Sequence, residues 1–311
     1  MEIKQLADDV KNYYLTHFDE LGGYGFHFAS RLYLWCQDEE SKLKLDEKRK
    51  IYTHESAFQD QINFAVTQLR KKSIVFKNAN LLRKEYLDIW LRIKEINAVL
   101  YEILFAKTIF ASDYVDKFYE YFRVREIEDL IKQIYTTPRM LAVLSTQAIN
   151  LIYLYNKLIL EKHEIDQLVF LKIAKAGYNL SEKVEIQLMI YLLTHSIIGE
   201  TMFYYFPVRP SSTAMSIDMI STLERIIEKR YIDISLDSKC EFLVCARILG
   251  YESKLESKIY TEVSTSLSNE GTFIVDRHNN SLGKSKNFAK SEHRNVLFIM
   301  SAHAFHPIHD L

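Results

Sequence analysis

The chain reads LLTHSIIGETMFY from Leu192 to Tyr204, which places a histidine and a glutamate inside a run of apolar side chains. The wider segment 181–206 is apolar nearly all round a helix, and helices of this kind lie in the interior of a protein. Burying an imidazole and a carboxylate there costs free energy unless partners satisfy them. The stretch therefore predicts a central buried helix and marks a candidate interior site.

The helical pattern continues through the whole chain. Only 8 glycines and 4 prolines occur in 311 residues, whereas sheet proteins spend both types on frequent turns. Apolar residues recur at spacings of three and four, which is the helical period. Helices are predicted at 2–19, 26–38, 55–72, 79–107, 113–134, 138–161, 163–176, 181–206, 213–230, 236–249, 251–267 and 287–305.

Start and stop signals support these boundaries. Pro138 stands in a favourable first-turn position, and Gly250 separates two helices. Asp237, together with Ser212 or Thr213, provides candidate N-caps. The charge-dense segment 38–50 indicates a solvated helix or loop.

Short links between consecutive helices predict an all-α fold built from antiparallel helical hairpins in series. Such an array forms an open solenoid or closes into an α/α toroid, and the toroid is the preferred prediction. Residues 1–135 are expected to form an N-terminal helical portion packed on a hairpin portion, 136–311. The alternative is a single continuous domain.

Charge and composition exclude some classes of protein. Lys+Arg number 40 and Asp+Glu 41, so no basic excess favours nucleic-acid binding. No uncharged run reaches the roughly 18–20 residues of a membrane span, and the N-terminus lacks an apolar signal core. Cys240 and Cys245 lie five apart on one predicted helix and are poor disulfide partners. A cytoplasmic, thiol-reduced protein is expected.

The first candidate site residues lie on the 181–206 helix. Glu200 follows His195 by five residues, about 140° around the helix, so the two cannot form an i,i+4 chelating pair. Gly199 shares the face of His195 and is expected to leave room for a partner or a ligand to approach the imidazole. Thr194 and Thr201 are candidate ligand-binding residues beside it. The competing interpretation is a satisfied core histidine and a glutamate paired with a neighbouring helix.

Two more candidates begin the last long helix. His293 precedes Val296 and Leu297 at three and four residues and is expected on their inward stripe. The helix N-terminus there favours anionic ligands. Arg294 is a candidate clamp for a phosphate or carboxylate, with a solvated arginine as the alternative.

The 236–249 helix supplies Glu241, which lies four residues after Asp237 on the same face. Asp237 is interpreted as a cap, and Glu241 as either a ligand-binding residue or a partner of Lys239 or Arg247. If helices alternate between inner and outer positions, then 181–206, 236–249 and 287–305 belong to the inner set. A zinc ion held by His195, Cys245 and His293 is one further hypothesis, without support from local spacing.

The run Asn269-Glu270-Gly271-Thr272-Phe273 resembles the Gly-x-Phe turn between hairpins of α/α-toroid proteins, which include terpenoid cyclases, prenyltransferase β-subunits and lanthionine cyclases. The Thr194-His195…Thr201 segment with the late His293 also resembles an uncharacterised bacterial α/α-toroid family. The resemblance covers about 180–305. It implies a ring of hairpins with a central cavity. The aspartate-rich motif of the terpene cyclases and the cysteine–histidine zinc pattern are absent.

Two functions are consistent with these patterns. One is a cavity-containing enzyme or ligand-binding protein that acts on an apolar or peptide-like small molecule through His195 and His293, with Glu200 as a third catalytic candidate. The other is a non-catalytic helical scaffold for a protein partner. The sequence does not decide whether the protein is an enzyme, and it identifies neither cofactor nor metal.

Overall fold

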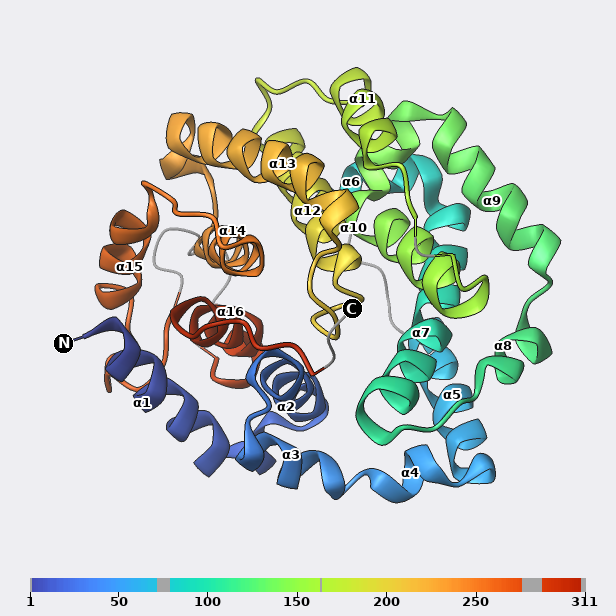
Figure 1. Cartoon of the computed structure of the whole chain (residues 1–311), viewed down its shortest axis with the longest axis horizontal. Coiled ribbons are helices and arrows are strands. Elements are labelled where there is room, and N and C mark those ends of the chain that lie inside the picture. Colours follow the sequence, from blue (N-terminus) through green and yellow to red (C-terminus); the bar gives the residue numbers. More distant parts are fainter. Residues whose placement is uncertain (1, 72–78, 163, 276–286, 309–311) are drawn as a thin grey trace. The chain divides into compact units, whose positions relative to one another are not determined.

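A computed structural model describes residues 2–71, 79–162, 164–275 and 287–308 (Figure 1). Within these ranges every regular element is a helix and no strand occurs, so the protein is all-α. The closest approach to sheet structure is one antiparallel bridge between Leu267 and Ile274. No helix in the described ranges is long and apolar enough to cross a membrane.

The chain divides into two compact units. Unit 1 contains Met1–Glu47 and Tyr204–Leu311, and unit 2 contains Lys48–Phe203. Unit 1 is therefore assembled from both ends of the chain. The expected boundary at 135/136 lies inside unit 2, at the end of the helix Val124–Thr136.

Unit 1 is built around two almost wholly buried helices, α14 (Leu236–Leu249) and α16 (Glu292–Ala302), which pack against each other. Apolar residues cover most of their circumference, and this composition favours a position between other helices. Figure 1 draws α1, α13 and α15 around them. The remaining helices of the unit are α1 (Ile3–Thr16), α2 (Gly23–Cys36), α3 (Glu39–Asp46), α13 (Pro210–Lys229) and α15 (Glu256–Ser264).

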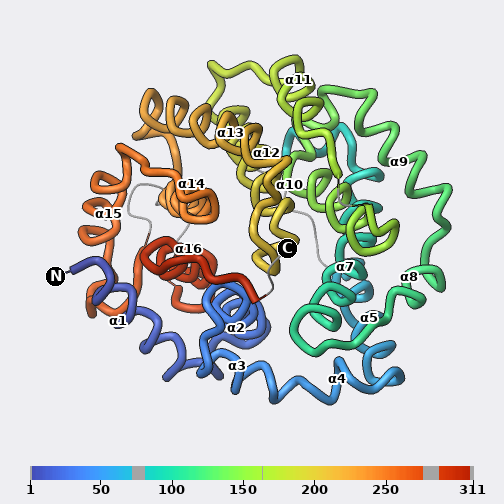
Figure 2. The backbone as a smooth tube through the Cα atoms, viewed as in Figure 1, coloured from blue at the N-terminus to red at the C-terminus, as the bar shows by residue number. Residues whose placement is uncertain are grey.

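Unit 2 has the same inner and outer organisation, with α10 (Pro138–Leu154) and α12 (Lys183–Glu200) as its most extensively packed pair. The backbone tube in Figure 2 shows α9 (Val124–Thr136) outside α10. The other helices are α4 (Arg49–Thr53), α5 (Glu55–Lys71), α6 (Ala79–Arg83), α7 (Leu87–Phe110), α8 (Val115–Tyr121) and α11 (Gln167–Gly177). A π-helical turn, η3 (Tyr155–Ile159), extends α10.

Several predicted boundaries agree with the structure. The helix 236–249 is found at the predicted residues, with Gly250 in the left-handed conformation at its C-cap, and Pro138 begins α10. The predicted N-caps are wrong. Ser235, rather than Asp237, accepts the cap hydrogen bond from Ser238, and α13 begins at Pro210 without a side-chain cap.

Two of the long predicted helices are each divided into separate elements. The predicted helix 113–134 is divided into α8 and α9, because Phe122 and Arg123 adopt extended backbone angles. The predicted helix 79–107 is divided by a 3₁₀ turn, Lys84–Tyr86. Apolar spacing alone does not reveal such breaks, because the periodic pattern resumes beyond them.

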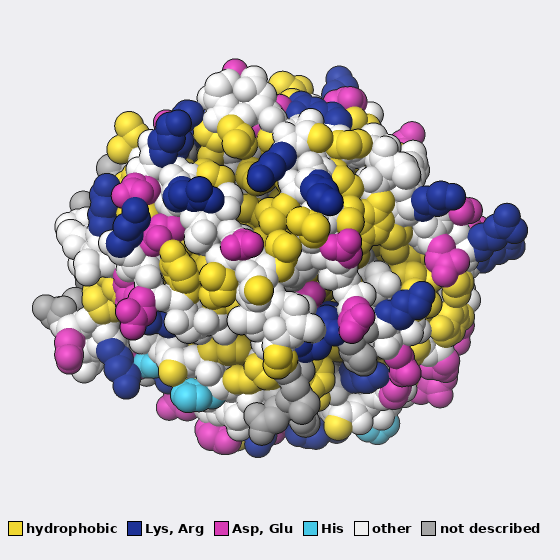
Figure 3. Space-filling view, turned by 45° about the horizontal axis from the view of Figure 1, so that its top comes forward, with side chains coloured by type: hydrophobic (Ala, Val, Ile, Leu, Met, Phe, Trp, Pro, Cys, Tyr) yellow, Lys and Arg dark blue, Asp and Glu magenta, His cyan; other side chains and the backbone are white. Residues whose placement is uncertain are grey.

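Cys36, Cys240 and Cys245 form no disulfide bonds. On the face drawn in Figure 3, lysine and arginine side chains are scattered among acidic and hydrophobic ones. This distribution agrees with the balanced charge of the sequence.

Candidate functional site

Residues 192–204 contain the C-terminal half of α12 and the four residues that follow the helix. The helix ends at Glu200 rather than at 206, and Met202, Phe203 and Tyr204 then have positive φ angles of 50°, 57° and 79°. Three consecutive bulky residues in the left-handed region carry backbone strain, and such strain concentrates at functional sites. The C-terminal end of α12 is therefore a candidate functional site.

His195 is half-buried on α12, and its Nδ1 lies 2.8 Å from Oδ1 of Asn150 on α10. The amide nitrogen of Asn150 donates in turn to the hydroxyl of Tyr101 on α7, at 2.7 Å. Asn150 itself is only 3% exposed. Because an amide oxygen only accepts, this assignment of the amide puts the proton of neutral His195 on Nδ1 and the lone pair on Nε2. We call these three residues the His195 network.

Aromatic rings adjoin the network. The ring of Phe203 meets Tyr101 edge to face at a centroid distance of 5.3 Å, and Phe105 stacks on Tyr101 at 6.2 Å. Phe203 is one of the strained residues after α12. The strained backbone at Phe203 therefore belongs to a residue whose ring contacts Tyr101 of the His195 network.

Glu200 takes a different position. Its carboxylate side chain is 0% exposed, and Lys157 of the π-helical turn lies 3.6 Å from Oε2. The same Lys157 donates to the main-chain carbonyl of Glu200 at 2.6 Å. The pair thereby satisfies a carbonyl at the C-terminal end of α12, where a cation is favoured. This geometry favours a structural role for Lys157, which holds the C-terminal end of α12 in place.

The space above Gly199 is filled by protein. A Cβ added there would lie 2.5 Å from the ring of Tyr153 on α10, so a protein side chain, rather than a ligand, occupies the room beside Gly199. The hydroxyl of Tyr153 accepts from Gln167 at 3.1 Å. Burial, together with the nearby Glu200 carboxylate, raises the pKa of Tyr153 well above its usual value.

The two candidate threonines are fully buried. Thr194 donates to the carbonyl of Tyr191, and Thr201 donates to that of Ile198 at 2.7 Å. Both hydroxyls bond to a carbonyl of the preceding turn, which is the usual local solution for a buried threonine in a helix.

The remaining candidates lie in unit 1. His293 is exposed, so the expectation that it shares the inward stripe of α16 is wrong, and Arg294 is buried in its place. Arg294 forms an ion pair with Asp237 and donates to the carbonyl of Ile274. Glu241 is buried on α14.

Unit 2 therefore holds Thr194, His195, Glu200 and Thr201, and unit 1 holds Glu241, His293 and Arg294. Within unit 1, the partner of Arg294 is Asp237. In the described ranges no group of three or more His, Cys, Asp or Glu side chains is arranged to hold a metal ion.

Asn150 and Lys157 contact the predicted residues His195 and Glu200, and Tyr101 bonds Asn150, but the sequence pattern did not single out any of these three. A signal was present, because Asn150, Tyr153 and Lys157 follow one another at intervals of three and four in an otherwise apolar segment. This spacing puts polar groups on one face of a buried helix. Along this face, Asn150 contacts His195, Tyr153 packs on Gly199, and Lys157 pairs with Glu200.

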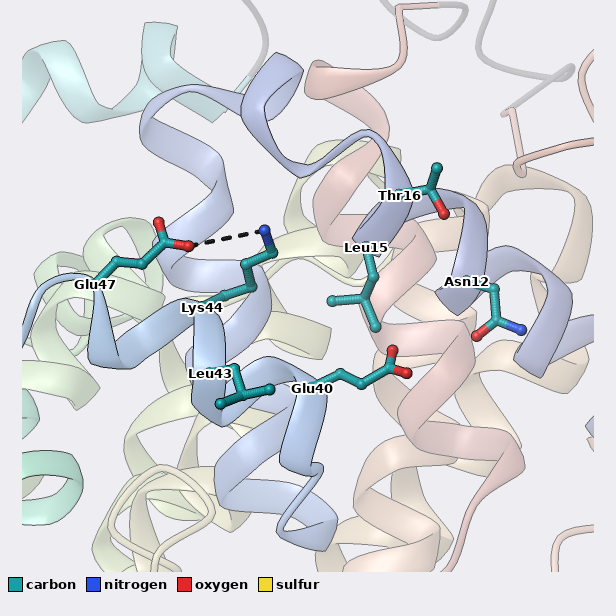
Figure 4. Close-up of a pocket in the computed structure, with 7 residues that line it drawn as sticks. All are labelled: Asn12, Leu15, Thr16, Glu40, Leu43, Lys44 and Glu47. Carbon is teal, nitrogen blue, oxygen red and sulfur yellow. Dashed lines mark ion pairs between the residues drawn. The ribbon is translucent and has the colours of Figure 1, made fainter.

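A surface cavity of about 570 Å³ lies in unit 1 between α1 and α3 (Figure 4). Leu15 and Leu43 provide apolar lining, and Lys44 and Glu47 form an ion pair across 3.8 Å at its edge. None of the predicted site residues lines this cavity.

Comparison of the chain with protein-family models, with curated proteins and with solved structures gives no significant match.

Proposed function

We propose that this protein binds or transforms a small molecule through the imidazole of His195. The observation that carries the proposal is the 2.8 Å hydrogen bond between Nδ1 of His195 and the buried amide of Asn150, on a ring that is only half-buried. A fixed tautomer prepares Nε2 to accept a proton or a hydrogen bond. The resulting function is acid–base catalysis or recognition of a hydrogen-bond donor.

The expected ligand is a small molecule with an aromatic, apolar or peptide-like portion. This choice rests on the aromatic ring of Tyr101 within the network and on the ring of Phe203 that packs against it. The sequence-based hypothesis joined His195 with His293. Because His293 is exposed and belongs to the other unit, the present proposal depends on His195 alone.

For the fold we propose the finer arrangement of an α/α toroid with a central cavity, in a cytoplasmic protein. Its support is the alternation of nearly buried helices, such as α14 and α16, with helices exposed on one side, such as α13 and α15. The free thiols fit a reducing compartment. An experimentally determined structure tests the arrangement, and an open row of hairpins would contradict it. Cell fractionation tests the location.

The tautomer is the first test. Long-range ¹H–¹⁵N spectra of the imidazoles should give the Nδ1-protonated form for neutral His195 in the wild-type protein. Asn150→Leu should abolish that preference, since the accepting oxygen is lost. A neutral His195 protonated on Nε2 in the wild type would contradict the proposal.

The second test concerns binding. A library of small aromatic, apolar and peptide-like molecules is passed over wild-type protein, His195→Gln and the matched surface control His293→Gln, and the retained compounds are identified by mass spectrometry. At least one compound should be retained by wild type and by His293→Gln but lost with His195→Gln. If His195→Gln lowers stability and no compound distinguishes the three proteins, His195 is structural and the scaffold alternative is favoured.

A further inference from the structure

A second cavity, of about 330 Å³, lies in unit 2 between α9 and the π-helical turn η3. Its volume is at the lower end of the range for small-ligand sites. Ile131 of α9 and Leu160, which follows η3, form apolar walls. The polar lining includes Glu128, Lys132, Tyr155 and Lys162.

The π-helical turn shapes one side of this cavity. The amide of Leu160 donates to the carbonyl of Tyr155 at 3.1 Å, which is the i→i+5 bond of a π-turn, and the amide of Lys162 reaches back to the carbonyl of Asn156 at 2.8 Å. Glu161 between them has a φ of 52°. Such turns occur frequently at functional sites because they redirect side chains out of the regular helical pattern.

One residue of the cavity lining, Tyr155, has a buried hydroxyl group whose hydrogen-bonding capacity is not satisfied. It is 1% exposed, and its hydroxyl has no hydrogen-bond partner in the described part of the chain. Burial, with a smaller contribution from Glu128, raises the pKa of Tyr155 to about 12, so the hydroxyl remains a donor at neutral pH. A buried donor without an acceptor is costly, and in native proteins it calls for an explanation.

Charge indicates which acceptor fits. Lys132 approaches the cavity from α9 and Lys162 from the segment after η3, against the single carboxylate of Glu128. The lining as a whole therefore has a net positive charge, and Glu128 is the charged group that acts on the Tyr155 hydroxyl. Ammonium groups and a phenol together bind a carboxylate by charge-assisted hydrogen bonds.

We propose that this cavity binds a small organic carboxylate. Its carboxylate accepts from the Tyr155 hydroxyl and pairs with Lys132 and Lys162, while its apolar remainder packs on Ile131 and Leu160. This inference is independent of the function proposed for His195, because no residue of the His195 network lines the cavity.

The test uses benzoate as the probe, with benzamide as its uncharged counterpart and inorganic phosphate as a simple anion. Titrations are followed by NMR of the Ile and Leu methyl groups in the full chain. Benzoate should shift Ile131 and Leu160 and should bind more tightly than benzamide or phosphate. Tyr155→Phe, which retains the ring, should weaken benzoate binding by about tenfold. Lys132→Met should weaken it as well.

Tyr24→Phe, at an exposed tyrosine of unit 1, is the matched control and should leave benzoate affinity unchanged. Circular dichroism checks that each variant is folded. Equal binding of benzoate and benzamide, or of benzoate and phosphate, would overturn the proposal. So would benzoate affinity that Tyr155→Phe leaves intact.

Discussion

The ammonium of Lys157 lies 2.6 Å from the main-chain carbonyl oxygen of Glu200 and 3.6 Å from the carboxylate of the same residue. One side chain thus neutralises a buried charge and satisfies a carbonyl at the end of a helix. Lys157 and Glu200 are 5% and 0% exposed, so water does not substitute for either partner. Breaking such a pair leaves an uncompensated buried charge.

Lys157→Met should therefore destabilise the protein by about 3–5 kcal/mol. Glu200→Gln added to Lys157→Met should recover part of this loss, because the isolated charge is then gone. Denaturant unfolding monitored by circular dichroism gives both values. Glu126→Gln, which breaks the exposed pair with Arg92, is the control and should cost only about 0–1 kcal/mol. A loss with Lys157→Met no larger than that of the control would refute the anchoring role.

Gly199→Ala tests the close contact with Tyr153. In an open helix this change is stabilising, but here the new methyl group would overlap the aromatic ring and should cost about 1–3 kcal/mol. Gly23→Ala, where nothing lies within 4 Å of the added atom, should be neutral or stabilising. Tyr153→Leu should relieve the overlap, so a double-mutant cycle is expected to give a favourable coupling energy. Additive effects would show that the ring does not set the limit.

Glu102 should make the protein less stable as the pH rises. Burial raises its pKa above 4.5 and outweighs the hydrogen bonds from Tyr52 and Gln61. The folded state then holds a proton that the unfolded state has released, so stability is greatest below pH 4.5 and declines as the pH rises through the folded-state pKa. Glu102→Gln should stabilise the protein at pH 7 and lose that advantage near pH 4. Unfolding midpoints at several pH values measure this, and a destabilised variant at pH 7 would contradict it.

Glu224 should have the opposite effect. Burial alone would raise its pKa, but hydrogen bonds from Ser253, Tyr251 and the amide of Lys254 hold it below 4.5. Its stabilising contribution is present above pH 4.5 and disappears as the pH falls through the folded-state pKa. Glu224→Gln should cost about 1–3 kcal/mol at pH 7 and little at low pH. The same pH series tests it, and a loss that stays constant at all pH values would argue against the lowered pKa.

The helical class and most helix positions could be predicted because they depend on local periodicity and on turn residues. The helix 236–249 is an example, since Gly250 ends it in the conformation that glycine favours. The buried character of residues 184–200 also followed from composition. The end of this helix could not be predicted in the same way. The left-handed residues after Glu200 are Met202, Phe203 and Tyr204, and residues of these types rarely adopt that conformation.

The candidate site was predictable only in part for a related reason. His195 was identified as an unusual polar residue, but Asn150, to which it hydrogen-bonds, lies 45 positions earlier on α10, and Tyr101, which bonds Asn150, lies 94 positions earlier on α7. Such contacts depend on tertiary packing, and the spacing within one helix cannot reveal them. His293 was predicted to be buried because it precedes Val296 and Leu297 at helical spacing. Val296 and Leu297 are buried, but His293 is exposed and its neighbour Arg294 is buried instead.

The π-helical turn sets a limit on how this chain can change by insertion and deletion. A single residue added to a helix leaves such a turn, and each residue corresponds to about 100° of rotation. Loss of Asn156 would convert the π-turn into an α-helical turn, which would shift Lys157 relative to Glu200 and change the cavity side of the turn at the same time. Substitutions can alter these two regions separately, whereas a change in length at 155–159 alters both at once. Descendants of this chain are therefore expected to vary in sequence there while conserving the number of residues.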